Sequence, residues 1–333
     1  MNKDNLLIER ETVLKQYLRG IALACAFFSV SAASAAYPAK PVAVVVGFPA
    51  GQSVDVAARL IMERLASQLK TPFVIYNKPG AGGVIGTDFV AKSAADGYTL
   101  LFGSSSSLVI NAELYKSLPY NTLRDFQPVS LVATAPMFLV INKDLPVSNL
   151  AEFIQYAKGK PGQLNYASAG NGLTNHLVME MLKKEAGLDI LHVPYKGSSA
   201  GLADLVGGRV QAMFDAGPGA LPLYKQGLVR IIAVSSATRS RAAPEIPTLR
   251  EGAVNMDAVG WVGLMAPAGT PADRVATLSD QVGKALGESD MSEKLIGLGF
   301  EPQHQPAAEF VQTIKTELPI WGRAVRESGA TVD

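Results

Sequence analysis

The chain has 333 residues, of which 48% are hydrophobic and 18% are charged, a length that usually forms two domains. Its 30 basic and 29 acidic side chains leave a net charge near zero, so no basic field favours a nucleic-acid partner. The single cysteine, Cys25, excludes a disulfide framework within one chain.

The first 36 residues have the pattern of a signal peptide that is removed on export. Basic side chains precede an apolar run at 21–30, and small residues follow at 31–36. The run is shorter than the roughly 20 residues that span a bilayer, and the small residues suit cleavage near Ala35 or Ala36. Cys25 lies too early in the run to fit a lipoprotein site well. We therefore expect a periplasmic protein whose mature chain has no cysteine.

The mature chain begins with short apolar runs that alternate with helical patterns. Strands are predicted at 42–48, 73–76 and 98–102, and helices at 53–69 and 84–91. Strands that are apolar throughout and separated by helices indicate a parallel sheet with both faces covered. The first part of the chain is therefore predicted to be an α/β unit.

The same pattern then restarts. Strands are predicted at 138–141, 164–167, 190–193, 210–214, 231–234 and 261–265. Helices are predicted at 149–157, 174–186, 271–286, 290–298 and 306–326, and further helices are predicted between the later strands. The order predicts two doubly wound α/β lobes, residues 37–137 plus 257–333 and residues 138–256, between which the chain crosses more than once.

Two loops, one in each unit, follow a strand and open a helix. They are residues 48–55 and residues 168–176, and both carry glycine and small polar side chains. Ligands of parallel α/β sheets lie beyond the carboxyl ends of the strands, and the N–H groups of a helix start suit a carboxylate. An ordinary helix cap is the alternative for each loop.

Catalytic and cofactor sites have weaker support. The glycine-rich turn at 78–86 lacks the acidic residue that a dinucleotide site needs after the next strand. Ser168, His176 and Asp215 can be drawn as a hydrolase triad, but the sequence before Ser168 lacks the first glycine of a nucleophile elbow. The three histidines have no metal-ligand spacing. We therefore predict no metal, no cofactor and no enzymatic activity.

A series of short segments, in their order and spacing, resembles the extracytoplasmic receptors of the tripartite tricarboxylate transporters, also called the Bug family. The resemblance covers essentially the whole mature chain. The segments lie at 77–83 (NKPGAGG), 96–101 (DGYTLL), 118–120 (LPY), 164–168 (LNYAS), 192–197 (HVPYKG), 213–215 (MFD) and 266–271 (APAGTP).

The resemblance implies a type II periplasmic-binding-protein fold, in which two lobes close on a ligand and backbone N–H groups grip its carboxylate. It implies a monomeric receptor that captures a di- or tricarboxylate, an acidic amino acid or an aromatic acid and delivers it to membrane transporter subunits. A ligand sensor for a signalling partner, or a periplasmic enzyme, are the alternatives. The ligand-binding residues carried over are Phe48, Gly51, Gln52, Ser53, Asp55, Ser104, Ser105, Ser168, Gly170, Asn171, Thr174, His176 and Asp215.

One position departs from the family pattern. The first loop of the family usually reads Pro-Gly-Gly, whereas this chain has Ala50, Gly51 and Gln52. The side chain of Gln52 therefore stands where the family has a bare glycine. It either adds a hydrogen-bond donor to the ligand or blocks the usual seat of the carboxylate.

Overall fold

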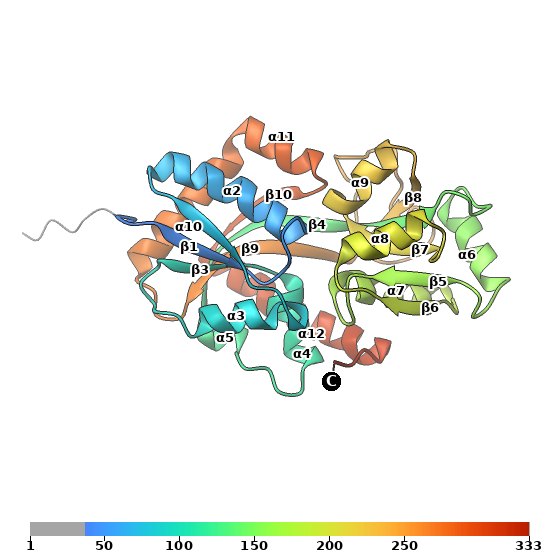
Figure 1. Ribbon diagram of the computed structural model, residues 1–333, viewed down its shortest axis with the longest axis horizontal. Helices are drawn as coiled ribbons and strands as arrows, with labels where there is room; N and C mark the ends of the chain where they lie inside the picture. Colours follow the sequence, from blue (N-terminus) through green and yellow to red (C-terminus); the bar gives the residue numbers. More distant parts are fainter. Residues whose placement is uncertain (1–36, 333) are drawn as a thin grey trace, which may run out of the picture. The chain divides into compact units, whose positions relative to one another are not determined.

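A mixed β-sheet forms the centre of the part of the chain that the computed structural model describes, residues 37–332 (Figure 1). The predicted signal peptide lies outside the described residues. The strands follow one another across the sheet in the order β2 (Phe73–Asn77), β1 (Val42–Val46), β3 (Thr99–Ser104), β9 (Val259–Pro267), β4 (Phe126–Asn142), β7 (Ala212–Ala216), β5 (Asn165–Ser168) and β6 (Leu191–Pro194). Two further strands, β10 (Glu301–Pro306) and β8 (Val229–Val234), also pair with β4.

Strand β4 belongs to both ends of this sheet. Up to Pro136 it pairs with β9, and from Met137 onward it pairs with β7 and β8. Figure 1 shows β4 and β9 running together between the strands β1–β3 and the strands β5–β7. The sheet therefore consists of two groups of strands joined by long central strands.

The prediction of parallel sheets is wrong for the centre of the molecule. Strand β1 is parallel to β2 and β3, and β5 is parallel to β6 and β7. However, β9 is antiparallel to β3 and β4, and β4 is antiparallel to β7, β8 and β10. A strand covered on both faces is apolar throughout whichever way its neighbours run, so the apolar pattern did not reveal this direction.

The first half of β4 was also missed. The strand spans 17 residues, whereas only 138–141 were predicted. Its earlier part contains Pro128 and Pro136, and its register with β9 shifts between Pro128 and Ser130 and again between Leu131 and Ala133. Proline interrupts the usual strand signal, but it is tolerated where the ladder is irregular.

Helices cover the sheet close to where the apolar spacing predicted them. The bounds of α2 (Ser53–Leu69), α3 (Val84–Ala91) and α7 (Thr174–Ala186) match the prediction at both ends. The other long helices are α6 (Leu150–Lys158), α8 (Ser198–Val206), α9 (Gly217–Lys225), α10 (Ala272–Gly287), α11 (Ser289–Gly297) and α12 (Ala307–Ser328). Short helical turns occur at η1 (Ala81–Gly83), η2 (Ser106–Ile110), α4 (Asn111–Leu114) and α5 (Thr122–Asp125).

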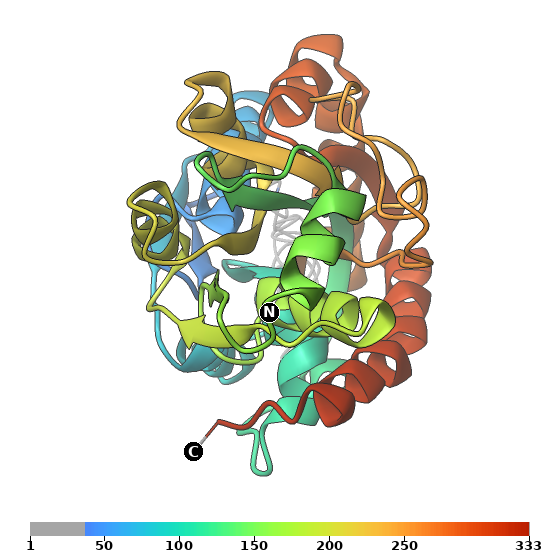
Figure 2. The ribbon, with the colours of Figure 1, turned by 90° about the vertical axis from the view of Figure 1, so that its right-hand side faces the viewer.

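The C-terminal helix α12 packs on elements of both strand groups. It contacts β4, η2 and α4 on one side and α7 on the other, and Figure 2 shows it in red beside them. Its Phe310 meets the ring of Trp261 edge-on, with the ring centroids 5.0 Å apart. No helix within residues 37–332 has both the length and the apolar character that a membrane span requires.

Candidate ligand-binding cleft

A cavity of about 80 Å³ lies where the two strand groups meet, and we call it the inner chamber. The elements that line it are the start of α2, the end of β3, the start of α7, the end of β7 and the start of β9. Its walls are Phe48, Gln52, Ser53, Val54, Ser104, Ser105, Ser106, Ala135, Met137, Ala169, Leu173, Thr174, Asn175, Ser198, Asp215, Ala216, Gly260, Trp261, Val262 and Phe300. Residues far apart in the sequence thus line one small space.

Four helices begin at the inner chamber with no side-chain cap from the residue that precedes them, although the first N–H of α7, that of Thr174, donates to Ser106 Oγ at 3.3 Å. The residues that precede α2, α7, α8 and α9 are Gln52, Leu173, Gly197 and Ala216, and none of them makes a side-chain capping bond. The first N–H groups of a helix have no partner inside it, and they carry the positive end of the helix dipole. Among the described residues, no Lys or Arg lines the chamber. The available positive charge is therefore that of the backbone, as in anion sites at helix starts.

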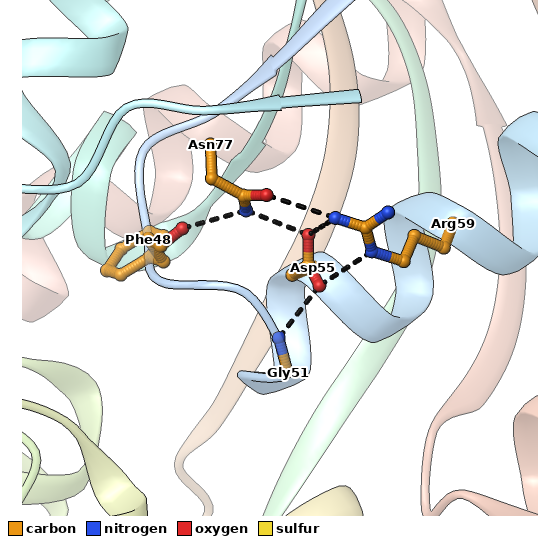
Figure 3. A network of polar contacts seen from close by, with 5 residues as sticks. All are labelled: Phe48, Gly51, Asp55, Arg59 and Asn77. Carbon is orange, nitrogen blue, oxygen red and sulfur yellow. Dashed lines mark hydrogen bonds and ion pairs between the residues drawn. The ribbon is translucent and has the colours of Figure 1, made fainter. Parts of the chain in front are cut away.

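The first loop, residues 48–55, is tied from behind by Asp55 (Figure 3). The Asp55 carboxylate is 1% exposed. It accepts hydrogen bonds from Gly51 N at 2.8 Å, from Asn77 Nδ2 at 2.8 Å and from two nitrogens of Arg59 at 2.9 and 3.0 Å. Asn77 Nδ2 also donates to the carbonyl of Phe48. Loop, helix α2 and strand β2 are thereby joined through one carboxylate.

This carboxylate is held in its ionised form. Burial by itself would raise the pKa of Asp55, but the hydrogen bonds from Arg59, Gly51 N–H and Asn77 outweigh it, so the pKa lies below its ordinary value. Gly51 has φ of 82°, a conformation that glycine adopts without strain, and this directs its N–H toward Asp55.

The second loop, residues 168–176, is tied by two histidines instead. His176 Nδ1 accepts the N–H of Gly172 at 3.0 Å, and Ser168 Oγ lies 2.6 Å from His192 Nε2. The two imidazole rings stack with centroids 3.9 Å apart, and the ring of Tyr166 stacks on His192 at 4.8 Å. The loop therefore rests on a layer of flat rings.

Both histidines are neutral at physiological pH. Burial, with a smaller contribution from Lys183, lowers the pKa of His176 to about 4. Burial and the neighbouring His176 lower the pKa of His192 to about 3. A neutral His176 is required for its Nδ1 to accept the N–H of Gly172, because a protonated ring has no acceptor.

Two polar atoms in the wall of the inner chamber have no partner within the described residues. They are Oγ of Ser104, at the end of β3, and Oδ2 of Asp215, at the end of β7. The other oxygen of Asp215 accepts a hydrogen bond from Ser198 Oγ at 2.6 Å. Burial raises the pKa of Asp215 to about 7, so near neutral pH its carboxyl group is protonated in a large fraction of molecules. Buried polar atoms without partners are rare and are expected where a ligand or water binds.

A larger pocket of about 710 Å³ adjoins the inner chamber, and we call it the outer pocket. It is lined by the first and second loops, the turn at 79–83, the segment at 195–197, Tyr115 and the end of the chain at 331–332. The two spaces share four wall residues, Phe48, Gln52, Ala169 and Leu173.

The residues predicted to bind ligand fall into three groups. Those in the wall of the inner chamber are Phe48, Gln52, Ser53, Ser104, Ser105, Thr174 and Asp215. Gly170 and Asn171 line the outer pocket, where the Asn171 amide donates to the carbonyl of Thr331. Gly51, Asp55, Ser168 and His176 lie behind the loops, with the hydrogen bonds described above, and line neither space. Loop position alone did not separate wall residues from those that brace the loop.

Several wall residues were not predicted. Ser198 begins α8 directly after Gly197, and the same strand-loop-helix pattern that selected the two main loops was available there. Ser106 directly follows the predicted Ser104 and Ser105, and its Oγ shares a hydrogen bond of 2.8 Å with Thr174 Oγ1. Met137 and Trp261 come from the long central strands, which carry no loop motif that points to a ligand.

The three residues of the alternative triad are not assembled. Ser168 contacts His192 instead of His176, and Asp215 contacts Ser198. Within residues 37–332 there is also no group of three or more His, Cys, Asp or Glu side chains that could hold a metal ion.

Comparison with known proteins decides the family. Residues 57–330 match the model of the tripartite tricarboxylate transporter family receptor. The chain belongs to this receptor family. Among its relatives, protein BugT of Bordetella pertussis is 38% identical over 93% of this chain and 96% of its own length. A protein from the tcbD-tcbE intergenic region of Pseudomonas sp. strain P51 is 36% identical over 94% of both chains.

Solved structures of related receptors have the same fold. Rpa4515 of R. palustris with adipate has a TM-score of 0.85 at 35% identity, covering 89% of this chain and 99% of that chain. MatC of Rhodopseudomonas palustris with bound malate has a TM-score of 0.79 at 33% identity, covering 87% and 100%. The periplasmic binding protein BugD has a TM-score of 0.82 at 32% identity, covering 89% and 99%. The predicted α/β, two-lobed periplasmic-binding-protein fold is therefore confirmed for this receptor.

Proposed function

We propose that this receptor is exported to the periplasm, captures a small carboxylate-bearing ligand in the inner chamber and delivers it to membrane transporter subunits. The observation that carries the proposal is the convergence of four helix starts on a chamber that, among the described residues, no Lys or Arg lines. Di- and tricarboxylates, acidic amino acids and aromatic acids are the candidate ligands. The adipate and malate bound by two structural relatives support the acidic class.

Backbone donors are sufficient for such binding. A hydrogen bond to a charged group contributes on the order of 1.5–3 kcal/mol. Micromolar affinity corresponds to about 8 kcal/mol, so a few such bonds, with the small side chains of the wall, account for it. Asp215 does not oppose an acid when its carboxyl group is protonated, and it then offers a donor to the ligand.

Ligand capture is proposed to close the two lobes, residues 37–137 plus 257–333 and residues 138–256. Strand β4 changes partners between Pro136 and Met137, and β9 begins at Val259, which supports a hinge at these two points. Both lobes contribute walls to the inner chamber, and a small ligand therefore contacts both only in the closed form. Its higher affinity for that form then favours closure.

Isothermal titration calorimetry of acids and their neutral amides tests the carboxylate. Malate, succinate, glutamate and benzoate are each compared with the corresponding amide at one pH and salt concentration. At least one acid should bind, and its amide should bind far more weakly. Equal affinity for an acid and its amide would contradict the proposal. Delivery is tested by deleting the gene, which should abolish growth on the acid that binds.

The role of Asp215 is tested by Asp215→Asn, with Ser198→Ala as the matched control. The amide keeps the size of the side chain and a donor, but it does not titrate. Acid affinity should therefore fall less from pH 6 to pH 8 in Asp215→Asn than in the wild type, and ligand preference should change with little loss of thermal stability. Ser198→Ala retains the carboxyl group and should retain a pH dependence, shifted to higher pH because the hydrogen bond from Ser198 lowers the pKa of Asp215. A collapse of stability in Asp215→Asn would indicate a purely structural role.

A further inference from the structure

Four residues from the two main loops line both the inner chamber and the outer pocket. Phe48 and Gln52 come from the first loop, and Ala169 and Leu173 come from the second. We call these four residues the partition. A ligand that extends from the inner chamber into the outer pocket has to pass it.

Three members of the partition are held in place by their surroundings. Phe48 is 7% exposed, its carbonyl accepts the amide of Asn77, and its ring lies against Gly83, where a Cβ would come within 3.1 Å of it. Leu173 lies between the glycines at 82 and 170. The carbonyl of Ala169 accepts the N–H of Gly197 at 2.9 Å. These contacts leave little room for the three residues to move aside.

Gln52 is the long, polar member, and it reaches across the cleft. It precedes α2 in the first strand group, but its side chain does not cap that helix. Instead its amide lies against Gly197, which precedes α8 in the second group: a Cβ at Gly197 would come within 2.4 Å of Gln52 Nε2. Gly197 has φ of 113°, a conformation that glycine adopts without strain. The absence of a side chain at Gly197 also leaves room for the amide of Gln52.

We propose that Gln52 is a specificity-determining residue that closes the inner chamber toward the outer pocket and restricts the ligand to a compact dicarboxylate. The proposal rests on the proposed carboxylate-binding function. A volume of about 80 Å³ holds only a handful of water-sized groups, which suits a short diacid. A longer diacid needs space beyond the partition, and that space opens only when the Gln52 side chain leaves Gly197.

The test compares Gln52→Ala with Gln68→Ala, which removes a glutamine from the far end of the same helix. Gln68 hydrogen-bonds Glu288, away from the cleft. Calorimetry measures the affinity of each protein for the unbranched diacids malonate, succinate, glutarate, adipate, pimelate and suberate. Gln52→Gly serves as a second variant, since glycine is accepted before a helix. The measured quantity is the ratio of affinity for the longer diacids to affinity for succinate.

We expect the wild type and Gln68→Ala to prefer the short diacids. In Gln52→Ala and Gln52→Gly the ratio should shift toward the longer diacids by about tenfold or more, the usual effect of opening room for an extra methylene. An unchanged ratio in both Gln52 variants, or a wild type that already prefers suberate, would overturn the role of Gln52 while leaving carboxylate binding intact. Failure of every acid to bind to the wild type would overturn the proposed function and this inference together.

Discussion

In the first loop of the cleft the brace is an ionised carboxylate, whereas in the second it is a pair of neutral imidazoles. Asp55 collects four hydrogen bonds from Gly51, Arg59 and Asn77. His176 and His192 each hold one group of the second loop and stack on one another. Asp55, His176 and His192 do not line the inner chamber, whereas residues at the starts of α2 and α7 do.

The difference teaches that one geometric task is solved by a charged group in one loop and by neutral groups in the other. Asp55 acts when it is deprotonated, and its pKa lies below the ordinary value. His176 also acts when it is deprotonated, but its pKa is only about 4, and that of His192 is about 3. At neutral pH both loops are held. On acidification the second loop has to give up its acceptor at His176, whereas the lowered pKa of Asp55 keeps that carboxylate charged below its ordinary titration range.

The largest effect is expected for Asp55→Ala. The variant removes the acceptor of four hydrogen bonds and leaves Gly51 N–H without its partner. Breaking a buried ion pair costs about 3–5 kcal/mol, and because Arg59 is half exposed we expect about 2–3 kcal/mol here. Urea unfolding measures the cost, and calorimetry should show weaker acid binding. Asp125→Ala, which removes the more exposed ion pair with Arg124 and the hydrogen bond from Asn121 N–H at α5, is the control and should cost about 1 kcal/mol, less than Asp55→Ala. Equal costs for the two variants would contradict the bracing role of Asp55.

An intermediate effect is expected from pH. Because the folded pKa values of His176 and His192 lie below the ordinary 6.5, the unfolded chain binds more protons, and the free energy of unfolding falls as the pH drops from 6.5 toward 4. Each histidine contributes up to about 1.4 kcal/mol per pH unit in this window. Asp215 and Glu317, whose pKa values burial raises to about 7, act in the opposite direction.

The measurement is therefore the difference between the wild type and His192→Gln in urea unfolding at pH 7, 6, 5 and 4. Glutamine still bonds Ser168 but does not titrate, so the variant should lose less stability on acidification than the wild type. His304→Gln, in β10 and outside the second loop, controls for the loss of one histidine. Parallel pH profiles for the wild type and His192→Gln would show that this imidazole does not sense pH.

The smallest effect is expected for Asn77→Ala. This change removes three hydrogen bonds, those from the Asn77 amide to Phe48 and Asp55 and the one from Arg59 to the Asn77 amide oxygen, but it leaves the ion pair of Asp55 and Arg59 and the bond from Gly51. The loss should be about 1–2 kcal/mol, because each hydrogen bond contributes roughly 0.5–1.5 kcal/mol and Arg59 is half exposed. Urea unfolding of Asn77→Ala and Asp55→Ala under the same conditions shows which variant loses more free energy of unfolding. A cost for Asn77→Ala as large as that for Asp55→Ala would place the centre of the brace at Asn77.

The sequence by itself determined the helices, most strands, the two main loops and the family. Apolar spacing is a local property, and it located α2, α3 and α7 at both ends. The order of strand, loop and helix is also local. It located the two loops, because ligands of α/β sheets bind beyond the carboxyl ends of the strands. Seven predicted residues, from Phe48 to Asp215, line the inner chamber.

Only the tertiary structure decided strand direction and the division of labour among the predicted residues. The antiparallel pairing of β4 and β9 depends on neighbours that are distant in sequence. Gly51 and Ser168 sit in loops that look suited to a ligand, but their polar groups are directed to Asp55 and His192. The reach of Gln52 to Gly197 spans two strand groups. Each of these facts is set by packing between distant segments, which local pattern does not encode.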